Sequence, residues 1–460
     1  MAEFFGSIET LSAAYASQQL KPSQVVAAYL RAIETHDSHL GAYQSVFFET
    51  AMQAAEGADK AIMSGHRIGP FHGIPFALKD IFDLEGEICS NGSQALKNRI
   101  SPTTGTVVRR LIAAGGIILG KTKTVECAFG GWGTNQQMGT PWNPWDLKNH
   151  RIAGGSSSGS AVATAASMAV CAIGTDTGGS VRLPAAYCGI VGLKVTEGQL
   201  PCDGIMPLAQ TLDTPGPLAQ TVADTAILYE VMQGREGVLI DRERLAKNGL
   251  YGAMEKGVSG LRLGQIDEAE RENCSPEILF GYDNAIEHLR RLGAVVEVFS
   301  TPFHYDRLAN DNGAITAVEA YNNHGLLYED NAAPVDEDVR ERVLAGKKYL
   351  AHDYARMLQT RLQRCGEFYA KMHGYDAILT PTCTSTAPKV ADVDQKTPPG
   401  HFTRPFNYLA MCALSVPLNI AGDGLPQGMQ IVARPHDEAM VVRIGAGIEA
   451  ALPAKGRAPL

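Results

Sequence analysis

Short apolar runs alternate with longer amphipathic segments along most of the 460 residues. The pattern predicts strands, each next to a helix or a glycine-rich turn, at 117–119, 170–174, 190–193, 260–266, 294–299, 375–379 and 429–433. A chain that alternates strands and helices in this way folds as an α/β protein. We therefore expect a sheet with helices packed against it.

Helices are expected where apolar residues recur every three or four positions. Val26, Tyr29, Leu30 and Ile33 lie on one face of such a helix, and Pro22 lies near its start. Similar patterns predict helices through most of 1–66 and at 106–114, 160–169, 276–292, 301–372 and 438–452. The chain shows neither a fixed-period repeat nor a linker-like stretch that divides it in two.

The charge balance and the cysteines limit the class of protein. Lys and Arg number 40 against 49 Asp and Glu, a formal net charge of −9, whereas a nucleic-acid-binding chain usually has a basic surface. No stretch approaches the roughly 20 apolar residues of a membrane-spanning helix, and residues 1–20 lack the apolar run of a signal peptide. The nine scattered cysteines include no C-x-x-C pair, which favours free thiols. We expect a cytoplasmic protein with no nucleic-acid or membrane partner.

Two segments rich in glycine and serine flank a predicted helix and strand. Residues 153–160 read Ala-Gly-Gly-Ser-Ser-Ser-Gly-Ser, and residues 174–182 read Gly-Thr-Asp-Thr-Gly-Gly-Ser-Val-Arg. A flexible linker is disfavoured because apolar patterns follow at once. A phosphate-binding loop is disfavoured because the G-x-x-x-x-G-K-[ST] and G-x-G-x-x-G spacings are absent. A tight connection between packed elements remains an alternative to a functional site.

The second segment repeats a Gly-Gly-Ser directly after a predicted strand, at Gly178, Gly179 and Ser180. Successive glycines let backbone N–H groups converge and bind an anion, and a serine there has its hydroxyl beside an oxyanion hole. A serine nucleophile also needs a base. The twelve histidines offer no obvious helper motif and no H-E-x-x-H or other metal-ligand spacing, so we expect no metal site.

Lysine is the remaining base, and Lys79 ends the apolar run Gly-Ile-Pro-Phe-Ala-Leu-Lys-Asp of residues 73–80. Lysines are rarely buried without a role, and burial lowers a lysine pKa toward the value that a general base needs. The alternative is a structural Lys79 that reaches the surface or pairs with Asp80. On this residue alone, the structural alternative is favoured.

Taken together, these segments resemble the amidase signature family, the serine amide hydrolases with a Ser–cis-Ser–Lys triad. This family keeps a step of 24 residues between its two catalytic serines, which matches Ser156 and Ser180 and selects Ser156 over Ser157 and Ser158. The resemblance extends over most of the chain, through 73–80, 120–122, 143–145, 154–160, 174–184, 189–194, 214–218, 377–381 and 413–417.

The resemblance implies a role for each residue of the triad. Ser180 is the nucleophile that forms an acyl-enzyme, Ser156, preceded by a cis peptide bond, relays the proton, and a neutral Lys79 accepts it. No metal or organic cofactor is implied. Asp176 and Arg182 flank the loop, and we expect them to be a structural pair. The backbone N–H groups implied to bind the oxyanion are those of Thr177, Gly178, Gly179 and Ser180.

The resemblance also implies the architecture. We expect one large mixed sheet with helices on both faces, forming a single α/β domain of residues 1–460. Residues 60–225 then form the signature core with the triad, and residues 226–375 shape the substrate side. Homodimers are common among such enzymes.

One wall of the substrate site is expected where the family places backbone beside the scissile group. A wall with aromatic side chains suits an apolar or aryl acyl amide, whereas Trp145, in an Asn-Pro-Trp segment, is expected to be structural. Residues 321–324, Tyr-Asn-Asn-His, either add polar contacts to the pocket or cap a helix. The residues expected to form this wall are Phe129, Gly130, Gly131 and Trp132.

We therefore expect a serine amidase that hydrolyses a small acyl or aryl amide to a carboxylate and ammonia or an amine. The alternative is the glutamine-hydrolysing A subunit of a tRNA-dependent amidotransferase, which shares the triad. Residues 197–204, Glu-Gly-Gln-Leu-Pro-Cys-Asp-Gly, depart from the Tyr-Gly-Arg-Val-Ser-Arg type of stretch associated with that subunit. A non-catalytic anion-binding protein is disfavoured because Lys79, Ser156 and Ser180 are all present.

Overall fold

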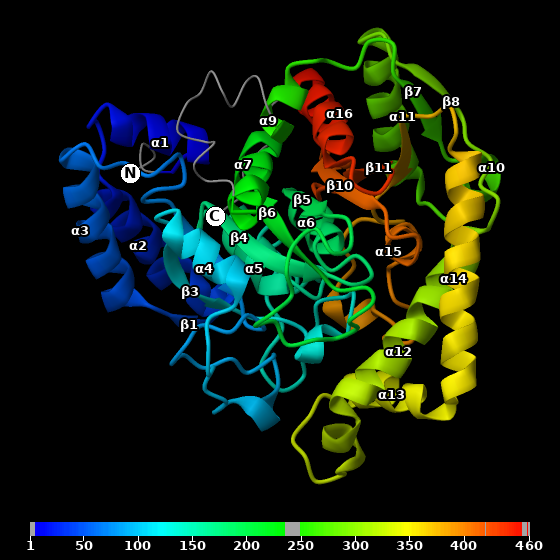
Figure 1. Cartoon of the computed structure of the whole chain (residues 1–460), viewed down its shortest axis with the longest axis horizontal. Coiled ribbons are helices and arrows are strands. Elements are labelled where there is room, and N and C mark those ends of the chain that lie inside the picture. The colour runs from blue at the N-terminus through cyan, green and yellow to red at the C-terminus, as the bar shows by residue number, and fades with distance from the viewer. Residues whose placement is uncertain (1–4, 235–248, 419, 453–457, 459–460) are drawn as a thin grey trace.

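A mixed sheet of eleven strands runs through the computed structural model, which describes residues 5–234, 249–418, 420–452 and 458 (Figure 1). Strand β2 is parallel to β3 and β4, β7 is parallel to β8 and β9, and the other neighbours are antiparallel. Across the sheet, the strands are β1 (Tyr43–Val46), β3 (Ile117–Thr122), β2 (Pro75–Lys79), β4 (Cys171–Asp176), β6 (Thr214–Ala219), β5 (Val191–Lys194), β10 (Cys412–Pro417), β11 (Gly428–Ala433), β9 (Ala377–Pro381), β7 (Arg262–Gln265) and β8 (Val295–Val298).

Helices pack on both faces of this sheet. On β10, the side chains of Leu414 and Val416 face Gly445 of α16, whereas Ser415 lies on the side of α6, next to Ala186. Successive strand residues point to opposite faces, so α6 and α16 cover opposite faces. The predicted mixed α/β sheet flanked by helices is confirmed. The helices are α1 (Ile8–Ala16), α2 (Pro22–Leu40), α3 (Phe48–Met63), α4 (Thr106–Ala113), α5 (Ser158–Ala165), α6 (Arg182–Cys188), α7 (Val222–Met232), α9 (Gly249–Met254), α10 (Glu268–Arg271), α11 (Pro276–Arg291), α12 (Tyr305–Glu329), α13 (Glu337–Leu344), α14 (Ala351–Lys371), α15 (Arg404–Tyr408) and α16 (Glu438–Ala451).

The strongly periodic helices form where the sequence predicts them. Helix α2 begins at Pro22 and buries all four residues of its predicted apolar face. Two helical stretches end earlier than predicted, each near a residue with positive φ. The helical region expected over 1–66 is broken after Gly41, at φ 60°, where β1 follows. Helix α5 ends at Ala165 rather than at 169 because the chain turns at Ser167, at φ 54°.

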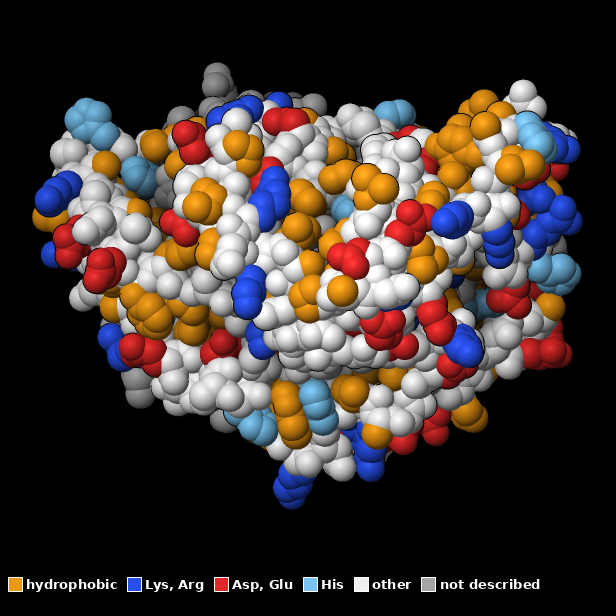
Figure 2. Space-filling model, turned by 90° about the horizontal axis from the view of Figure 1, so that it is seen from below, with side chains coloured by type: hydrophobic (Ala, Val, Ile, Leu, Met, Phe, Trp, Pro, Cys, Tyr) orange, Lys and Arg blue, Asp and Glu red, His pale blue; other side chains and the backbone are white. Residues whose placement is uncertain are grey.

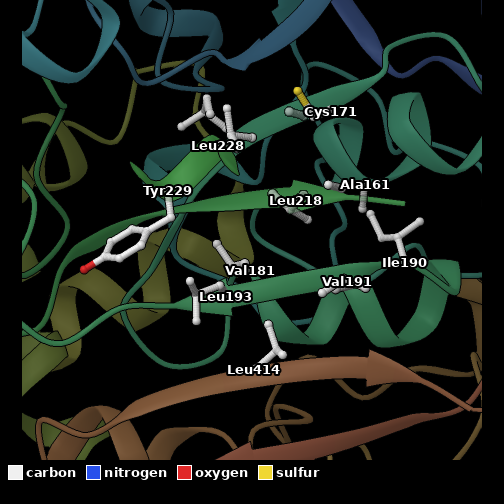
Figure 3. Close-up of a cluster of buried hydrophobic side chains, with 14 of the residues drawn as sticks. Ala161, Cys171, Val181, Ile190, Val191, Leu193, Leu218, Leu228, Tyr229 and Leu414 are labelled. Carbon is white, nitrogen blue, oxygen red and sulfur yellow. The ribbon is translucent and has the colours of Figure 1, made fainter. Parts of the chain in front are cut away.

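Apolar side chains from distant segments hold the central strands in place (Figure 3). Ala161 of α5, Cys171 of β4, Leu193 of β5, Leu218 of β6 and Leu414 of β10 are each fully buried. Strands β4, β5, β6 and β10 are buried along their whole lengths, as expected for a sheet covered on both faces. This packing fixes the strand ends from which the functional loops leave.

The surface shown in Figure 2 carries basic and acidic side chains intermingled over the same face. No helix in the described ranges has the length and apolar character needed to cross a membrane. All nine cysteines are free of disulfide bonds, as predicted. The division into a core of 60–225 and a substrate side of 226–375 stays a prediction.

Candidate active site

Lys79 is the last residue of β2, a fully buried strand that lies between β3 and β4. Its Nζ lies 2.8 Å from Oγ of Ser156 and 2.8 Å from Oγ1 of Thr175, on β4. Burial lowers the pKa of Lys79 to about 7, although the carboxylates of Asp213 and Asp176 act in the opposite direction. A large fraction of the Lys79 side chains is therefore neutral near pH 7.

Asp80, which follows Lys79 in the sequence, belongs to another network. Its carboxylate lies 3.4 Å from Nζ of Lys121 and accepts a hydrogen bond from the backbone N–H of Ser90. Lys79 itself is 0% exposed. The structural alternative for Lys79, a surface position or a pair with Asp80, is wrong.

The first glycine- and serine-rich segment places Ser156, and neither of the next two serines, against Lys79. The peptide bond between Gly155 and Ser156 is cis, as the resemblance implied. The carbonyl of Ser156 accepts hydrogen bonds from the N–H of Val125 at 3.2 Å and from Oγ1 of Thr124 at 2.9 Å. Ser157 Oγ donates to the Thr175 carbonyl, and Ser158 Oγ is buried without a described partner. The loop around Ser156 is thus held in place by hydrogen bonds from Thr124 and Val125 to its backbone carbonyl.

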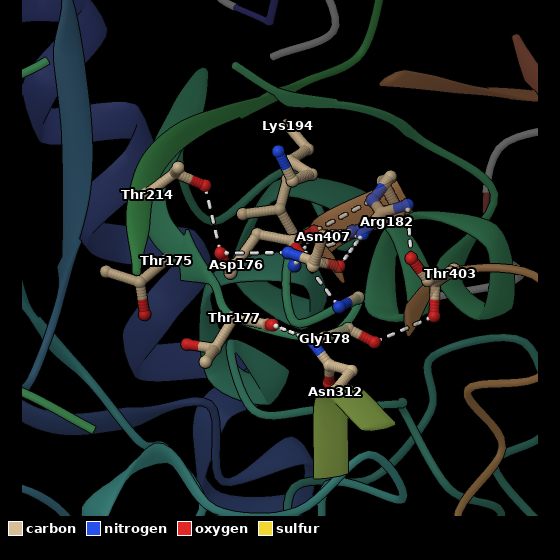
Figure 4. A network of polar contacts seen from close by, with 12 residues as sticks. Thr175, Asp176, Thr177, Gly178, Arg182, Lys194, Thr214, Asn312, Thr403 and Asn407 are labelled. Atoms are coloured by element: carbon tan, nitrogen blue, oxygen red, sulfur yellow. Dashed lines mark hydrogen bonds and ion pairs between the residues drawn. The ribbon is translucent and has the colours of Figure 1, made fainter. Parts of the chain in front are cut away.

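The second segment forms the turn between β4 and α6, and it carries Ser180. The N–H of Ser157 donates to the carbonyl of Ser180 at 3.2 Å, so the two serine loops are neighbours. The Asp176 carboxylate, at the end of β4, holds this turn: it lies 2.9 Å from Nη2 of Arg182 and accepts from the N–H of Gly179 at 2.7 Å (Figure 4). Both charged side chains are 0% exposed, and the predicted structural pair is confirmed.

The pKa of Asp176 reflects these contacts. Burial by itself raises the pKa of a carboxyl group, but the Arg182 guanidinium and the side-chain amide of Asn407 hold the pKa of Asp176 well below its usual range. Asp176 is therefore ionised across the neutral range and keeps its hydrogen bonds to the turn.

The same contacts change one detail of the expected oxyanion hole. The N–H of Gly179, expected to be one of four donors, is already bonded to Asp176. Within the described part of the chain, no hydrogen bond engages the N–H groups of Thr177, Gly178 or Ser180. These three groups remain available to bind an oxyanion.

A cavity opens beside this turn. Thr177, Gly178 and Ser180 line it, and Ser180 is 8% exposed. The four residues expected to form the substrate wall line it too, namely Phe129, Gly130, Gly131 and Trp132. The described chain places no group of three or more His, Cys, Asp or Glu side chains where they could hold a metal ion.

Other cavity residues were missed from the sequence, because they come from segments more than 130 positions after Ser180. Asn312 of α12 donates to the Thr177 carbonyl at 3.3 Å (Figure 4). Arg342 of α13 and Arg404 of α15 complete this side of the cavity. No local motif marks any of the three, so only the fold brings them to Ser180.

Several predicted contacts lie elsewhere. Asn323 Nδ2 donates to the Leu208 carbonyl, and His324 Nε2 lies 2.7 Å from the Pro207 carbonyl. Residues 321–324 lie inside α12 and neither line this cavity nor cap a helix, so both explanations were wrong. Trp145 Nε1 donates to the Cys188 carbonyl at 2.9 Å, in the structural role predicted for it.

Comparison with known proteins identifies the family to which a chain with this site belongs. A family model described as Amidase matches residues 24–442. The chain belongs to the amidase family. This amidase is 34% identical over 464 residues to the A subunit of glutamyl-tRNA(Gln) amidotransferase from Geobacter metallireducens, with 94% of each chain covered. It is also 34% identical over 425 residues to 2-amino-5-chloromuconic acid deaminase of Comamonas testosteroni, covering 90% of this chain and 89% of that protein.

The fold of this amidase matches solved structures as well. A crystal structure of an amidase aligns with a TM-score of 0.86 at 27% identity, covering 97% of this chain and 100% of that chain. The amidase signature fold is thereby shown, as the sequence predicted. This amidase is a hydrolase that acts on carbon–nitrogen bonds, with small amides as substrates.

Proposed function

We propose that this amidase hydrolyses a carboxylic amide through an acyl-enzyme on Ser180, releasing a carboxylate and ammonia or an amine. The observation that carries the proposal is the 2.8 Å contact between the buried Nζ of Lys79 and Oγ of Ser156, in the loop next to Ser180. A buried lysine with a pKa of about 7 has a large neutral fraction near neutral pH, and the neutral amine can accept a proton through a serine hydroxyl.

The acylation step uses each of these groups. Ser180 Oγ attacks the amide carbonyl carbon and passes its proton to Ser156, which passes its own proton to neutral Lys79. The carbonyl oxygen becomes an oxyanion and accepts hydrogen bonds from the N–H groups of Thr177, Gly178 and Ser180. The carbon–nitrogen bond then breaks as the leaving nitrogen takes a proton from Ser156, which Lys79 replaces.

Deacylation follows the same order of steps, with water as the nucleophile in place of Ser180. Water attacks the ester carbonyl on Ser180 while Ser156 and Lys79 accept its proton. The carbon–oxygen bond to Ser180 breaks as Ser180 Oγ takes that proton back through Ser156, and the carboxylic acid leaves and ionises in water. The turn held by Asp176 keeps its N–H groups in place for both steps.

A glutamine-hydrolysing component of an amidotransferase is the second candidate. One relative at 34% identity is the A subunit of a glutamyl-tRNA(Gln) amidotransferase, but the deaminase is equally similar, so identity does not separate the two. Residues 197–204 support the stand-alone enzyme, because their sequence departs from the stretch expected in the amidotransferase. In this chain Glu197 pairs with Arg361 at 2.6 Å.

Ammonia release by the purified chain alone separates the two candidates. We expect turnover of simple acyl and aryl amides, with little release from glutamine, and we expect Ser180→Ala to abolish it. Glutamine hydrolysis that far exceeds every simple amide would favour the amidotransferase component. Amide turnover retained by Ser180→Ala would exclude the proposed nucleophile.

We also propose a single-domain cytoplasmic enzyme that acts on small molecules. The nine free cysteines support a reducing compartment. The shared sheet supports the single domain, because β1 lies in the first fifty residues and β11 in the last fifty.

A further inference from the structure

The cavity beside Ser180 contains two charged side chains among the described residues that line it, and both are arginines, Arg342 and Arg404. No carboxylate lines this inner cavity within the described ranges. An adjoining cavity shares Arg342 and Arg404 with this one and is also lined by Asp338, Glu341, Asp394 and Lys396. The region next to the scissile bond is therefore positively charged.

Arg404 has no described partner for its guanidinium, as either an ion pair or a hydrogen bond. Its side chain lies against the oxyanion turn, since a Cβ built on Gly178 would be 3.2 Å from Arg404 Cγ. On the other side, a Cβ on Gly313 would be 3.4 Å from Nη1. Burial lowers the pKa of Arg404 to about 10, and the charge of Arg342 adds to this effect. Arg404 stays charged at neutral pH.

The buried arginines of the described chain are paired with acids. Arg182 pairs with Asp176, Arg361 with Glu197 and Arg340 with Glu337. Arg342 and Arg404 are only partly exposed, and a charge partly withdrawn from water without a partner is unfavourable. Unpaired arginines in a cavity therefore call for a ligand that supplies the missing negative charge. Arg404, whose guanidinium has no described partner, is the arginine for which such a ligand is most needed.

Arg342 lies close enough to influence Arg404 and has unused hydrogen-bond donors. Its Nη1 donates to the Phe129 carbonyl at 2.6 Å, and its Nη2 donates to the side chain of Gln395 at 2.7 Å. Its guanidinium forms no ion pair among the described residues, although the carboxylates of Asp338, Asp336 and Glu341 act on its pKa in the direction opposite to burial. A guanidinium has five N–H donors, so Nε and part of Nη1 are still free to bind a ligand.

We propose that Arg404, assisted by Arg342, binds a carboxylate that the substrate carries a few bonds from its scissile amide. The proposal rests on the proposed function and names the substrate class: short amides that end in a carboxylate, such as the half-amides of dicarboxylic acids. Arginine is suited to this role because its planar donors match a carboxylate in two parallel hydrogen bonds.

The same geometry disfavours a free amino acid amide. Glutamine differs from glutaramate, the half-amide of pentanedioic acid, only by an α-ammonium group. In the inner cavity that ammonium would face Arg342 and Arg404 with no described carboxylate to pair with. Glutaramate and glutamine are therefore a matched pair of probes that differ by the one charge in question.

The test compares kcat/KM of the wild-type enzyme for succinamate, glutaramate and adipamate with the uncharged amides in which a methyl group replaces the carboxylate. Hydrogen bonds to a charged group predict a preference of about 10- to 150-fold for the carboxylated amide of the right length. We also expect glutaramate to be hydrolysed faster than glutamine. Equal rates for charged and uncharged amides at all three lengths, or a preference for glutamine, would overturn the inference.

Substitutions of Arg404 test whether this arginine is the source of the carboxylate preference. In Arg404→Gln, the ratio of kcat/KM for carboxylated over uncharged amide should fall by about 10- to 150-fold, towards 1, and in Arg404→Lys it should fall less. Arg356→Gln, at a position 68% exposed on α14, is the control that keeps the wild-type ratio. An unchanged ratio in Arg404→Gln would overturn the inference. If Arg404→Gln does not fold, competitive inhibition of the wild type by glutarate against pentanoate supplies the same comparison, and equal inhibition overturns it.

These outcomes separate the inference from the proposed function. Hydrolysis of uncharged amides that depends on Ser180 supports the proposed function whatever the carboxylate preference. Hydrolysis that survives Ser180→Ala, with the carboxylate preference intact, supports the arginine site and rejects the nucleophile.

Discussion

Lys79 and Asp80 are consecutive in the chain, yet Lys79 contacts Ser156 at 2.8 Å while Asp80 pairs with Lys121 at 3.4 Å. Consecutive side chains at a strand end point to opposite sides, so the carboxylate cannot neutralise the lysine next to it. Lys121 takes that carboxylate, and Lys79 is left with two hydroxyl groups as hydrogen-bond partners. The separation of the two networks allows Lys79 to be neutral.

The pH dependence of catalysis should report Lys79. Its pKa of about 7 lies far below the ordinary 10.5, and only the neutral amine accepts a proton. We expect kcat/KM to rise about tenfold per pH unit below 7 and to level off above it. Lys79→Arg should not restore activity, because guanidinium stays protonated. A Lys79→Arg variant with nearly the wild-type rate would rule out the lysine base.

Asp213→Asn should move the acid limb of that profile to lower pH. The buried carboxylate of Asp213 raises the pKa of Lys79, so its removal makes the ammonium form less stable and lowers that pKa. Burial raises the pKa of Asp213 to about 6, so the group is largely ionised where Lys79 titrates. Asp203→Asn, at a position 54% exposed, is the control and should leave the limb in place. A shift to higher pH in Asp213→Asn would contradict the assignment.

Ser156 and Ser158 should differ sharply when each is changed to alanine. Ser156→Ala removes the hydroxyl in contact with Lys79, and we expect a loss of about 10²–10⁴-fold in kcat. Ser158→Ala removes a buried hydroxyl with no described partner, so neither activity nor stability should fall. Steady-state kinetics with thermal melting of both variants tests this. A larger loss in Ser158→Ala would mean that the serine register is wrong.

Asp176→Ala should destabilise the whole fold. It leaves the Arg182 guanidinium 0% exposed and without its carboxylate, a change that costs about 3–5 kcal/mol in comparable pairs. Glu297→Ala is the matched control, since Glu297 pairs with Arg262 at the surface, where a pair contributes about 1 kcal/mol or less. Urea unfolding measures the loss of the free energy of unfolding in each of the two variants. Equal losses of the free energy of unfolding would refute the structural role of the buried pair.

Gly179→Ala should inactivate the enzyme. Gly179 has φ 123°, and an added Cβ would lie 2.2 Å from Oγ1 of Thr403, so the turn that carries Ser180 has to shift. Gly198→Ala is the control, because Gly198 also has positive φ, at 79°, but nothing lies within 4 Å of its Cβ position. Labelling of Ser180 by a fluorophosphonate should be slow only in Gly179→Ala. Full labelling of that variant would show that the turn tolerates a side chain.

The predictable parts of the fold were those with strong local patterns. The apolar face of α2 and the succession from α4 through Gly115 and Gly116 to β3 follow from periodicity and glycine alone. Strands β1, β2, β6 and β10 were not predicted, and for β6 the reason is that Pro215 and Pro217 argue against a central strand. Both prolines are accommodated because β5 pairs only with Leu218 and Ala219, beyond them.

The residues of the candidate site likewise divide into those that could be predicted from local sequence and those that could not. Lys79, Ser156 and Ser180 lie in short segments with a distinctive composition, and the resemblance to the amidase signature family selected these three residues within them. Asp213, Arg342 and Arg404 are single charged residues in ordinary surroundings, and their place beside the triad depends on how distant helices and loops pack. A residue whose role depends on long-range packing carries no local signature.

The hydrogen bonds between Asp176 and the turn around Ser180 also determine at which stage the dipoles of this turn become oriented. Water around a developing oxyanion must reorient its dipoles during the reaction, and that reorientation is part of the barrier. Here the carboxylate fixes Gly179, Val181 and Arg182 through their N–H groups before any substrate arrives. The dipoles of this turn are oriented once, when the chain folds, and each catalytic cycle then begins with them already aligned.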